Sequence, residues 1–124
     1  MKFKLITRFC LFFATLLLSY NAFAFDSGAL ESIQARDLSP EAQQTIALIR
    51  QGGPFPYEKD GAVFGNYEKV LPQQKRGYYR EFTVKTPYAR NRGAKRMVTG
   101  GEKRSPREYY YTADHYRSFK RVID

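Results

Sequence analysis

The sequence predicts an α+β domain in which one main helix packs against a twisted antiparallel β-sheet. Two observations indicate this class. The clearest amphipathic helical pattern lies at residues 39–52, and the later segments are short runs of β-forming residues separated by Gly, Pro and charged residues. Because the helix precedes the strands, we expect it to cover one face of the sheet and to leave the other face open.

The predicted helix extends from Ser39 to Gly52. Ser39 suits the N-cap, Pro40 suits the first helical position, and Gly52 can end the helix in the left-handed conformation. Apolar residues follow the cap at helical spacing: Ala42, Ile46, Leu48 and Ile49. They give the helix one apolar side to bury.

Four segments after the helix are predicted strands: residues 80–85, 96–99, 109–112 and 118–122. In the first of them, Phe82 and Val84 point to one face of the sheet, while Glu81 and Thr83 point to the other. The spacing of the four segments is typical of an antiparallel meander.

Residues 1–24 are typical of a cleavable secretory signal. Three basic residues precede an apolar run at 11–18, which is too short to span a bilayer comfortably and is followed by Ala22-Phe23-Ala24. We expect cleavage after Ala24, an N-terminal arm over residues 25–37 and a single domain over residues 38–124. The cleaved protein would be secreted or periplasmic and free of the membrane; a retained N-terminal anchor is the alternative.

The chain is basic, and its exported part must rely on its core for stability. Of 21 Lys and Arg and 12 Asp and Glu, 18 basic and all 12 acidic residues follow Ala24, which leaves a net charge of +6. Cys10, the sole cysteine, lies in the predicted signal, so the exported domain has no disulfide. Basic charge suits RNA, DNA, an anionic membrane or a sulfated polymer, but the interleaved aromatic residues favour nucleic acid because bases stack on rings.

The reactive residues exclude several enzyme classes. Beyond Cys10 there is no cysteine nucleophile, and the chain has a single His, no P-loop, no HExxH motif and no visible carboxylate cluster for a metal-dependent nuclease. We therefore expect no metal and no cofactor. One His, isolated Glu residues and many Arg are still enough to cleave RNA, because RNA supplies its own 2′-OH nucleophile and needs only a base, an acid and cations.

Three features could carry that chemistry. Glu81 could be the base, His115 the acid, and the basic run at residues 90–96 a phosphate clamp. Taken from the residues alone, each has an alternative: an exposed strand carboxylate, a structural or surface histidine, and a solvated basic loop.

Six sequence blocks occur in the order found in bacterial guanyl-specific ribonucleases, the barnase-like microbial RNases, which this chain resembles from about Leu38 to its end. The blocks are GPFPY at 53–57, DGAVFGNYE at 60–68, VLP at 70–72, GYYREFTV at 77–84, ARNRGAKR at 89–96 and TADHY at 112–116. The resemblance implies a helix on a twisted antiparallel sheet whose open, concave face binds single-stranded RNA.

Position by position, the resemblance also implies roles. Glu81 resembles the general base and His115 the general acid. Arg92 and Arg96 match two phosphate-binding arginines, and Tyr116 matches a tyrosine that contacts the same phosphate.

The segment formed by Phe64, Gly65, Asn66, Tyr67 and Glu68 resembles the guanine-binding loop. In that scheme Glu68 accepts hydrogen bonds from the N1–H and amino group of guanine, while backbone N–H groups around Asn66 and Tyr67 reach O6. A carboxylate suits guanine because guanine presents adjacent donors on its Watson–Crick edge, whereas adenine presents an acceptor there. Several relatives place Arg where this chain has Tyr67, which would change how the base is covered.

The activity implied is guanyl-preferring endoribonuclease action without a metal, through a 2′,3′-cyclic phosphate that is then hydrolysed to a 3′-phosphate. It requires an ionised Glu81 and a protonated His115, and hence a bell-shaped pH profile. We expect a monomer, and an acidic, barstar-like protein inhibitor as a partner. The alternatives are a non-catalytic secreted module that binds RNA or another polyanion, and the same ribonuclease acting as an antibacterial toxin.

Overall fold

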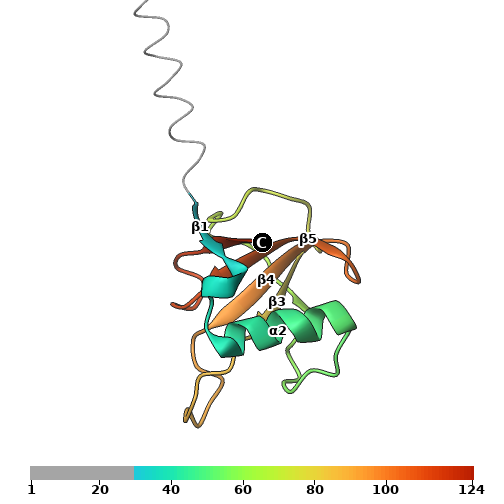
Figure 1. The fold of residues 1–124 in the computed structure, drawn as a ribbon. Helices are drawn as coiled ribbons and strands as arrows, with labels where there is room; N and C mark the ends of the chain where they lie inside the picture. Colours follow the sequence, from blue (N-terminus) through green and yellow to red (C-terminus); the bar gives the residue numbers. More distant parts are fainter. Residues whose placement is uncertain (1–29) are drawn as a thin grey trace, which may run out of the picture.

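The structure, a computed structural model, describes residues 30–124, so the predicted secretory signal and the first residues of the predicted arm lie outside the described residues. The described chain folds as one helix against a six-stranded sheet (Figure 1). The elements are β1 Glu31–Gln34, the 3-10 helix η1 Ala35–Asp37, α2 Pro40–Gln51, β2 Ala62–Val63, β3 Tyr79–Thr83, β4 Arg96–Gly101, β5 Pro106–Thr112 and β6 Lys120–Ile123.

The predicted α+β class is confirmed, but the sheet is mixed. Its strand order is β1-β6-β5-β4-β3-β2. Strands β3 to β6 pair antiparallel as predicted, and β2, which was not predicted, pairs antiparallel with β3. Strand β1 instead pairs parallel with β6, with Glu31 opposite Lys120. Part of the segment 25–37, predicted to be an arm, is therefore an edge strand. Its residues are mostly polar, so backbone pairing with β6, rather than an alternating apolar pattern, holds it in the sheet.

Helix α2 begins and ends where its sequence signals predicted. The Ser39 hydroxyl accepts a hydrogen bond from the Ala42 N–H at 3.2 Å, and Pro40 is the first helical residue. At the other end Gly52 adopts a φ of 83°, and its N–H donates to the Ile49 carbonyl at 3.2 Å. These contacts satisfy backbone groups that the ends of a helix otherwise leave free.

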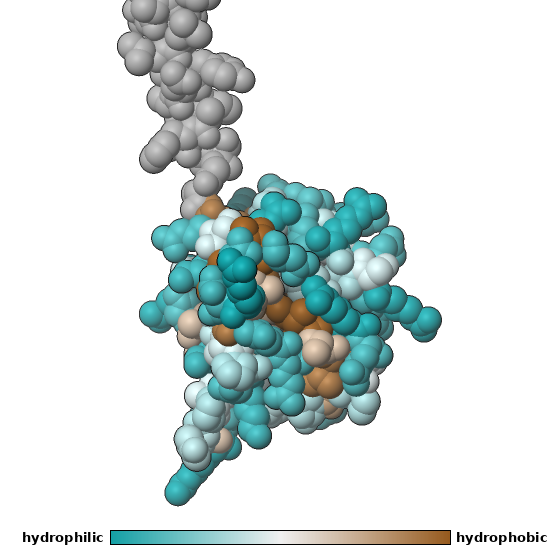
Figure 2. All heavy atoms as spheres, viewed as in Figure 1, coloured by the Kyte–Doolittle hydropathy of each residue, from teal (hydrophilic) through white to brown (hydrophobic). Residues whose placement is uncertain are grey.

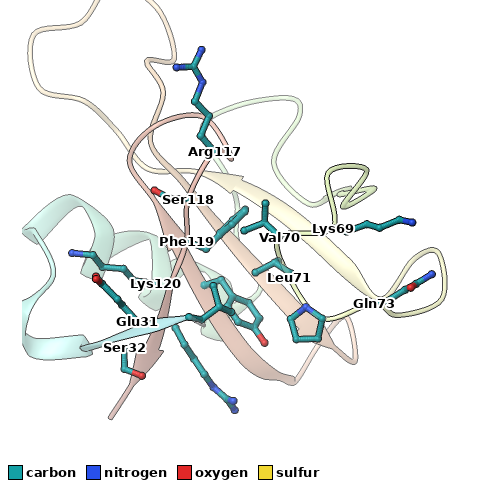
Figure 3. Close-up of a pocket in the computed structure, with 14 residues that line it drawn as sticks. Glu31, Ser32, Lys69, Val70, Leu71, Gln73, Arg117, Ser118, Phe119 and Lys120 are labelled. Carbon is teal, nitrogen blue, oxygen red and sulfur yellow. The ribbon is translucent and has the colours of Figure 1, made fainter. Parts of the chain in front are cut away.

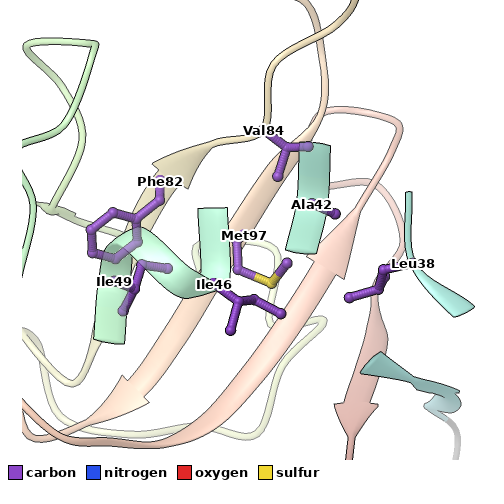
Figure 4. Close-up of a cluster of buried hydrophobic side chains, with 7 residues drawn as sticks. All are labelled: Leu38, Ala42, Ile46, Ile49, Phe82, Val84 and Met97. Carbon is purple, nitrogen blue, oxygen red and sulfur yellow. The ribbon is translucent and has the colours of Figure 1, made fainter. Parts of the chain in front are cut away.

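The helix packs on the face of the sheet formed by Phe82 and Met97, which are register partners on β3 and β4. Figure 4 shows the buried cluster that joins them, made of Leu38, Ala42, Ile46, Ile49, Phe82, Val84 and Met97. The Thr45 hydroxyl adds a buried hydrogen bond to the Thr83 carbonyl at 3.1 Å. The predicted alternation in residues 80–85 is thus confirmed, because Phe82 and Val84 face the helix.

A second apolar cluster covers part of the opposite, open face of the sheet. Its buried members are Leu71, Tyr79, Val98, Tyr110 and Phe119, with Phe64 and Tyr116 packed against them. The carboxylate of Glu108 accepts hydrogen bonds from the hydroxyls of Tyr78 at 3.1 Å and Tyr110 at 2.6 Å. Two surface segments therefore rest on a rigid floor: one follows β2, and the other joins β5 to β6.

The outer surface is mainly polar. In the view of Figure 2, hydrophilic residues cover most of the molecule, and hydrophobic residues are visible only in limited areas near its middle. Among the described helices, none combines the length and the apolar character needed to cross a membrane.

Truncation of the core beneath the helix tests this packing. Met97 is fully buried, so Met97→Ala should lower the free energy of unfolding by about 2–5 kcal/mol, because it removes buried methylene groups and leaves a cavity. Ile123→Ala is the control, since Ile123 is 38% exposed and should lose clearly less. Urea unfolding monitored by circular dichroism measures both variants; equal losses would contradict the assigned core.

Candidate active site

The register of the central strands places polar side chains together on the open face. Thr83 on β3, Arg96 on β4 and Thr112 on β5 are successive cross-strand partners, so their side chains lie on one face. Glu81 precedes Thr83 by two residues and therefore points to the same face. A carboxylate and a guanidinium thus stand on neighbouring strands, on the side of the sheet that α2 leaves uncovered.

Arg96 is buried, with only 3% of the residue exposed. Its Nη1 donates to the carbonyls of Gly93 at 3.0 Å and Lys95 at 2.8 Å, whereas its Nε has no hydrogen-bond partner within residues 30–124. Leaving a buried donor unpaired costs about 1–3 kcal/mol, and more when the group is charged. A guanidinium held in this way has donors ready for a phosphate oxygen, which its planar geometry suits.

Arg92 lies in the loop between β3 and β4 and is bound to β3. Its Nε and Nη2 donate to the Thr83 hydroxyl at 3.0 and 2.8 Å, and its Nη2 lies 3.4 Å from Oε1 of Glu81. The side chains of Arg92 and Glu81 are 25% and 17% exposed, so this ion pair is largely shielded from water. The ring of Tyr57 lies 6.0 Å from the guanidinium carbon of Arg92. These contacts fix both the carboxylate and the cation beside it.

Tyr116 links these charges to the aromatic cluster. Burial first, and then the negative charge of Glu81, raise the pKa of Tyr116 to about 12, while the positive charge of Arg96 opposes the shift. The hydroxyl therefore keeps its proton at neutral pH and lies close to both charged groups. The ring stacks on Phe64 with centroids 4.8 Å apart, which anchors it to the segment that follows β2.

His115 is exposed and lies on the tight turn that follows β5. Its backbone N–H donates to the carbonyl of Ala94 at 3.1 Å, which places the turn against the start of β4 and therefore near Arg96. The imidazole and the Tyr116 ring are 4.8 Å apart. His115 and Tyr116 have φ values of 54° and 74°, a left-handed conformation that costs about 1–2 kcal/mol per non-glycine residue and persists only where other contacts enforce it.

The Asp114 carboxylate supplies those contacts. It accepts hydrogen bonds from the Ser118 hydroxyl at 2.6 Å, the Ser118 N–H at 2.9 Å and the Thr112 hydroxyl at 2.9 Å. The bonds from Ser118 are the main reason that the pKa of Asp114 falls to about 2. The Thr112 hydroxyl also accepts from the Tyr116 N–H at 3.1 Å. The roles of Thr112 and Ser118 were not predicted from the sequence, although the spacing of their hydroxyls from Asp114 is a signal for a turn capped by side chains.

The predicted guanine loop, residues 64–68, forms a closed structure of its own. Asn66 has a φ of 52°, and its side-chain amide both donates to the Leu71 carbonyl at 2.9 Å and accepts from the Leu71 N–H at 3.1 Å. The N–H of Phe64 donates to the Tyr79 carbonyl at 2.9 Å, so the loop begins on β3. Glu68 in this loop is exposed.

Tyr67 packs back on its own loop although 81% of the residue is exposed. A Cβ at Gly65 would lie 2.5 Å from the Tyr67 ring, so only glycine lets the ring rest on the backbone there. The Tyr67 hydroxyl accepts a hydrogen bond from Arg76 at 3.1 Å. Tyr67 is therefore held in place both at its ring and at its hydroxyl.

A hollow of about 1070 Å³ borders this site (Figure 3). The segment after Glu68 contributes Val70 and Leu71 to its lining, and the segment after Tyr116 contributes Phe119 and Lys120. None of the predicted catalytic or guanine-binding residues lines it. The candidate site therefore lies beside this hollow, on the face of the sheet that α2 leaves uncovered.

The structure brings most of the predicted residues together. Five of them gather near the cross-strand partners Thr83, Arg96 and Thr112 of β3, β4 and β5: Glu81, Arg92, Arg96, His115 and Tyr116. The guanine loop contacts this group through the stacking of Phe64 on Tyr116. Glu68 forms no ion pair within residues 30–124, where the ion pairs join Arg50 to Asp124 and Arg92 to Glu81. Within residues 30–124, no group of three or more His, Cys, Asp or Glu side chains is arranged to hold a metal ion.

Three comparisons with known proteins agree with one another. A family described as ribonuclease matches residues 22–123. Guanyl-specific ribonuclease St of Saccharopolyspora erythraea is 49% identical over 98 residues, which cover 79% of this chain and 93% of that protein. Guanyl-specific ribonuclease Sa of Kitasatospora aureofaciens is 53% identical over 85 residues, which cover 68% of this chain and 85% of that protein.

The fold gives the same result. A crystal structure of ribonuclease Sa2 with guanosine-2′-cyclophosphate matches with a TM-score of 0.70 and 45% identity, covering 77% of this chain and 97% of that one. A second structure, of ribonuclease Sa2 in complexes with mononucleotides, matches with a TM-score of 0.72 and 44% identity. With its open face, its paired charges and these relatives taken together, the chain belongs to the ribonuclease family.

Proposed function

We propose that this protein is a guanyl-specific endoribonuclease that cleaves single-stranded RNA. The observation that carries the proposal is the grouping on one open face of a carboxylate, Glu81, a buried arginine, Arg96, and the turn that bears the histidine. The relatives named above are guanyl-specific ribonucleases, and one structural neighbour holds a guanosine cyclic phosphate.

In the first step Glu81 accepts the proton of the 2′-OH of the guanosine. The freed oxygen attacks phosphorus, the bond from phosphorus to the 5′-oxygen breaks, and His115 gives its proton to that leaving oxygen. The products are a 2′,3′-cyclic phosphate and a new 5′-OH end. DNA has no 2′-OH, so it can bind to this face but offers no nucleophile.

Charge develops on the phosphoryl oxygens in this step, and fixed donors lower its energy. Arg96 has an unpaired Nε on a buried guanidinium, and Arg92 is held by Thr83 and Glu81. The Tyr116 hydroxyl keeps its proton because of its raised pKa and can donate to the same oxygens. Donors that are already in place cost no reorganisation when the charge appears.

The second step reverses the proton transfers. His115, now neutral, takes a proton from water, and the water oxygen attacks phosphorus. The bond from phosphorus to the 2′-oxygen breaks, and Glu81 gives its proton to that oxygen. The product is a 3′-phosphate. No step requires a group beyond the residues already named.

Base selection is assigned to the guanine loop. Glu68 would accept from the N1–H and amino group of guanine, and the backbone around Asn66 would donate to O6. Two hydrogen bonds from the Asn66 side chain hold that backbone in its left-handed turn. Tyr67, which rests on Gly65, lies where it can cover the base.

The alternative function is a non-catalytic module that binds RNA. The similarity to guanyl-specific ribonucleases does not favour it. We also propose that the protein is exported by the segment 1–24, acts as a monomer, and is matched by an acidic protein inhibitor that protects the producing cell. Its use as a toxin against other bacteria remains the alternative biological role.

The acid and base can be tested directly. Glu81→Gln and His115→Ala should each lower turnover of a guanosine-containing oligonucleotide by about 10²–10⁴, the usual contribution of a positioned acid or base. Glu31→Gln is the control, because Glu31 is an exposed carboxylate on the edge strand β1. The assay contains EDTA and identifies cyclic-phosphate ends. Near-full activity of His115→Ala would contradict the proposed mechanism.

Glu68→Gln tests the recognition of guanine. An amide replaces an oxygen acceptor with a donor, so the preference for GpU over ApU should fall by about 1–3 kcal/mol, or roughly 5- to 150-fold, the discrimination typical of a paired base contact. The ratio of kcat/KM for the two dinucleotides measures it. An unchanged ratio would assign specificity to other residues.

Asp114→Asn tests the turn that carries His115. The folded-state pKa of Asp114 is about 2, below the usual value of 3.8, so the carboxylate stabilises the fold above about pH 4, and this contribution is lost as the pH falls from 3.8 to 2. The variant should therefore be less stable than the native protein at pH 6, and the difference should shrink towards pH 2.5. Urea unfolding at both pH values measures it; a difference independent of pH would show that the charge of Asp114 does not stabilise the turn.

A further inference from the structure

A second concentration of positive charge lies outside the candidate active site. It surrounds a hollow of about 460 Å³ at the end of the sheet where β3 begins and where β4 turns into β5. Five basic residues line this hollow and one acidic residue, Glu102, lies among them. We call the five the basic hairpin surface: Lys75, Arg76, Arg80, Lys103 and Arg107.

The sheet register brings these residues together from two distant segments. Tyr79 pairs with Gly100, so the residues before β3 lie beside the end of β4. The register shift at Gly101, which pairs with Pro106, then folds the next turn back toward the same end. Figure 1 shows the loop between β4 and β5 next to the segment that leads into β3.

None of the five basic residues of this surface forms an ion pair within the described residues, although Glu102 lies among them. Within residues 30–124 the ion pairs join Arg50 to Asp124 and Arg92 to Glu81. Arg76 and Arg80 donate to neutral acceptors instead, the Tyr67 hydroxyl at 3.1 Å and the Gly61 carbonyl at 2.8 Å. Like charges held around one hollow repel one another, and an anion with several charges relieves that repulsion.

The position of the basic hairpin surface indicates which kind of anion binds to it. Arg76 is bound to Tyr67, so the surface is continuous with the guanine loop. From Gly77 to Glu81 the chain advances four residues, or about 13 Å at the rise of a strand. A stacked nucleic-acid strand rises about 3.4 Å per nucleotide, so this distance corresponds to about four nucleotides.

Tyr78 strengthens the case for a nucleic acid over other anions. It is partly exposed, it lines the same hollow, and its hydroxyl is fixed by Glu108 at 3.1 Å. An aromatic ring beside several cations is the combination that binds single-stranded nucleic acid, because the ring stacks on a base while the cations attract phosphates. A membrane surface would not require a site within reach of the guanine loop.

We propose that the basic hairpin surface binds backbone phosphates of the RNA substrate a few nucleotides away from the linkage that is cleaved. The proposal rests on the proposed ribonuclease function and extends it: the enzyme holds a segment of strand rather than one dinucleotide. Oligonucleotides that reach the surface are therefore bound more tightly than short ones, and the difference depends on salt.

The test compares substrates of different length with two double variants. Lys75→Gln with Arg107→Gln removes one charge from each side of the surface, and neither side chain makes a hydrogen bond or ion pair within the described residues. The control, Arg36→Gln with Lys120→Gln, removes two exposed charges from η1 and β6, and neither residue lines this hollow. The substrates are GpU and two 10-mers with a single guanosine, one near the 5′ end and the other near the 3′ end.

We expect the native protein and the Arg36, Lys120 variant to cleave at least one 10-mer with a KM at least about fivefold below that for GpU. The Lys75, Arg107 variant should lose that advantage while its GpU cleavage stays within about twofold. Two lost phosphate contacts should also lower the slope of log K against log salt by about 1.4 for a single strand.

The outcomes separate the two proposals. If the native protein leaves GpU and both 10-mers intact, the ribonuclease function itself fails. If GpU is cut but both double variants retain the full length advantage, the phosphate-binding role is overturned. It is equally overturned if the Lys75, Arg107 variant keeps its RNA kinetics but loses binding to phosphatidylserine vesicles or to polyglutamate, because the surface would then serve a membrane or an acidic protein.

Discussion

The two-residue alternation of β3 and β4 is the constraint on which the molecule depends. Phe82 and Met97 must face the helix while Glu81 and Arg96 face the open side, and the pairing of Glu81 with Val98 and of Phe82 with Met97 sets both faces at once. A slip of one residue would bury the charges under α2 and expose the apolar partners. The core therefore does more than stabilise the fold, since the energy that holds Met97 against the helix also holds Arg96 on the opposite face.

That arrangement has costs which local hydrogen bonds offset. Burying the guanidinium of Arg96 removes it from water, and two backbone carbonyls compensate on one side only. The turn at His115 and Tyr116 keeps two successive residues in the left-handed region, which the Asp114 carboxylate and the Thr112 hydroxyl enforce. Two left-handed residues and an unpaired buried donor thus lie close to Glu81, where a substrate can use them.

How far the structure could be predicted from the sequence depended on whether each signal was local. The caps of α2 at Ser39 and Gly52 and the alternation in residues 80–85 lie within a few positions, and the structure confirms them. Strand β1 could not be predicted, because its stability comes from pairing with β6 at the other end of the chain. The resemblance named the residues around Glu81, but the grouping of segments 75–80 and 103–107 depends on strand register and has no signal in either segment alone.

One aromatic stack connects recognition with chemistry. Phe64 begins the guanine loop and stacks on Tyr116 at 4.8 Å, and Tyr116 in turn lies beside Glu81, Arg96 and His115. A guanine held by the loop therefore contacts the same aromatic cluster that positions the general acid, the general base and the groups that bind the phosphate. Phe64 and Tyr116 pack against Val98 and Tyr110 of the sheet, and this packing restricts movement of the loop. Binding energy from the base can then orient the scissile phosphate, which is how contacts remote from the reacting atoms contribute to rate.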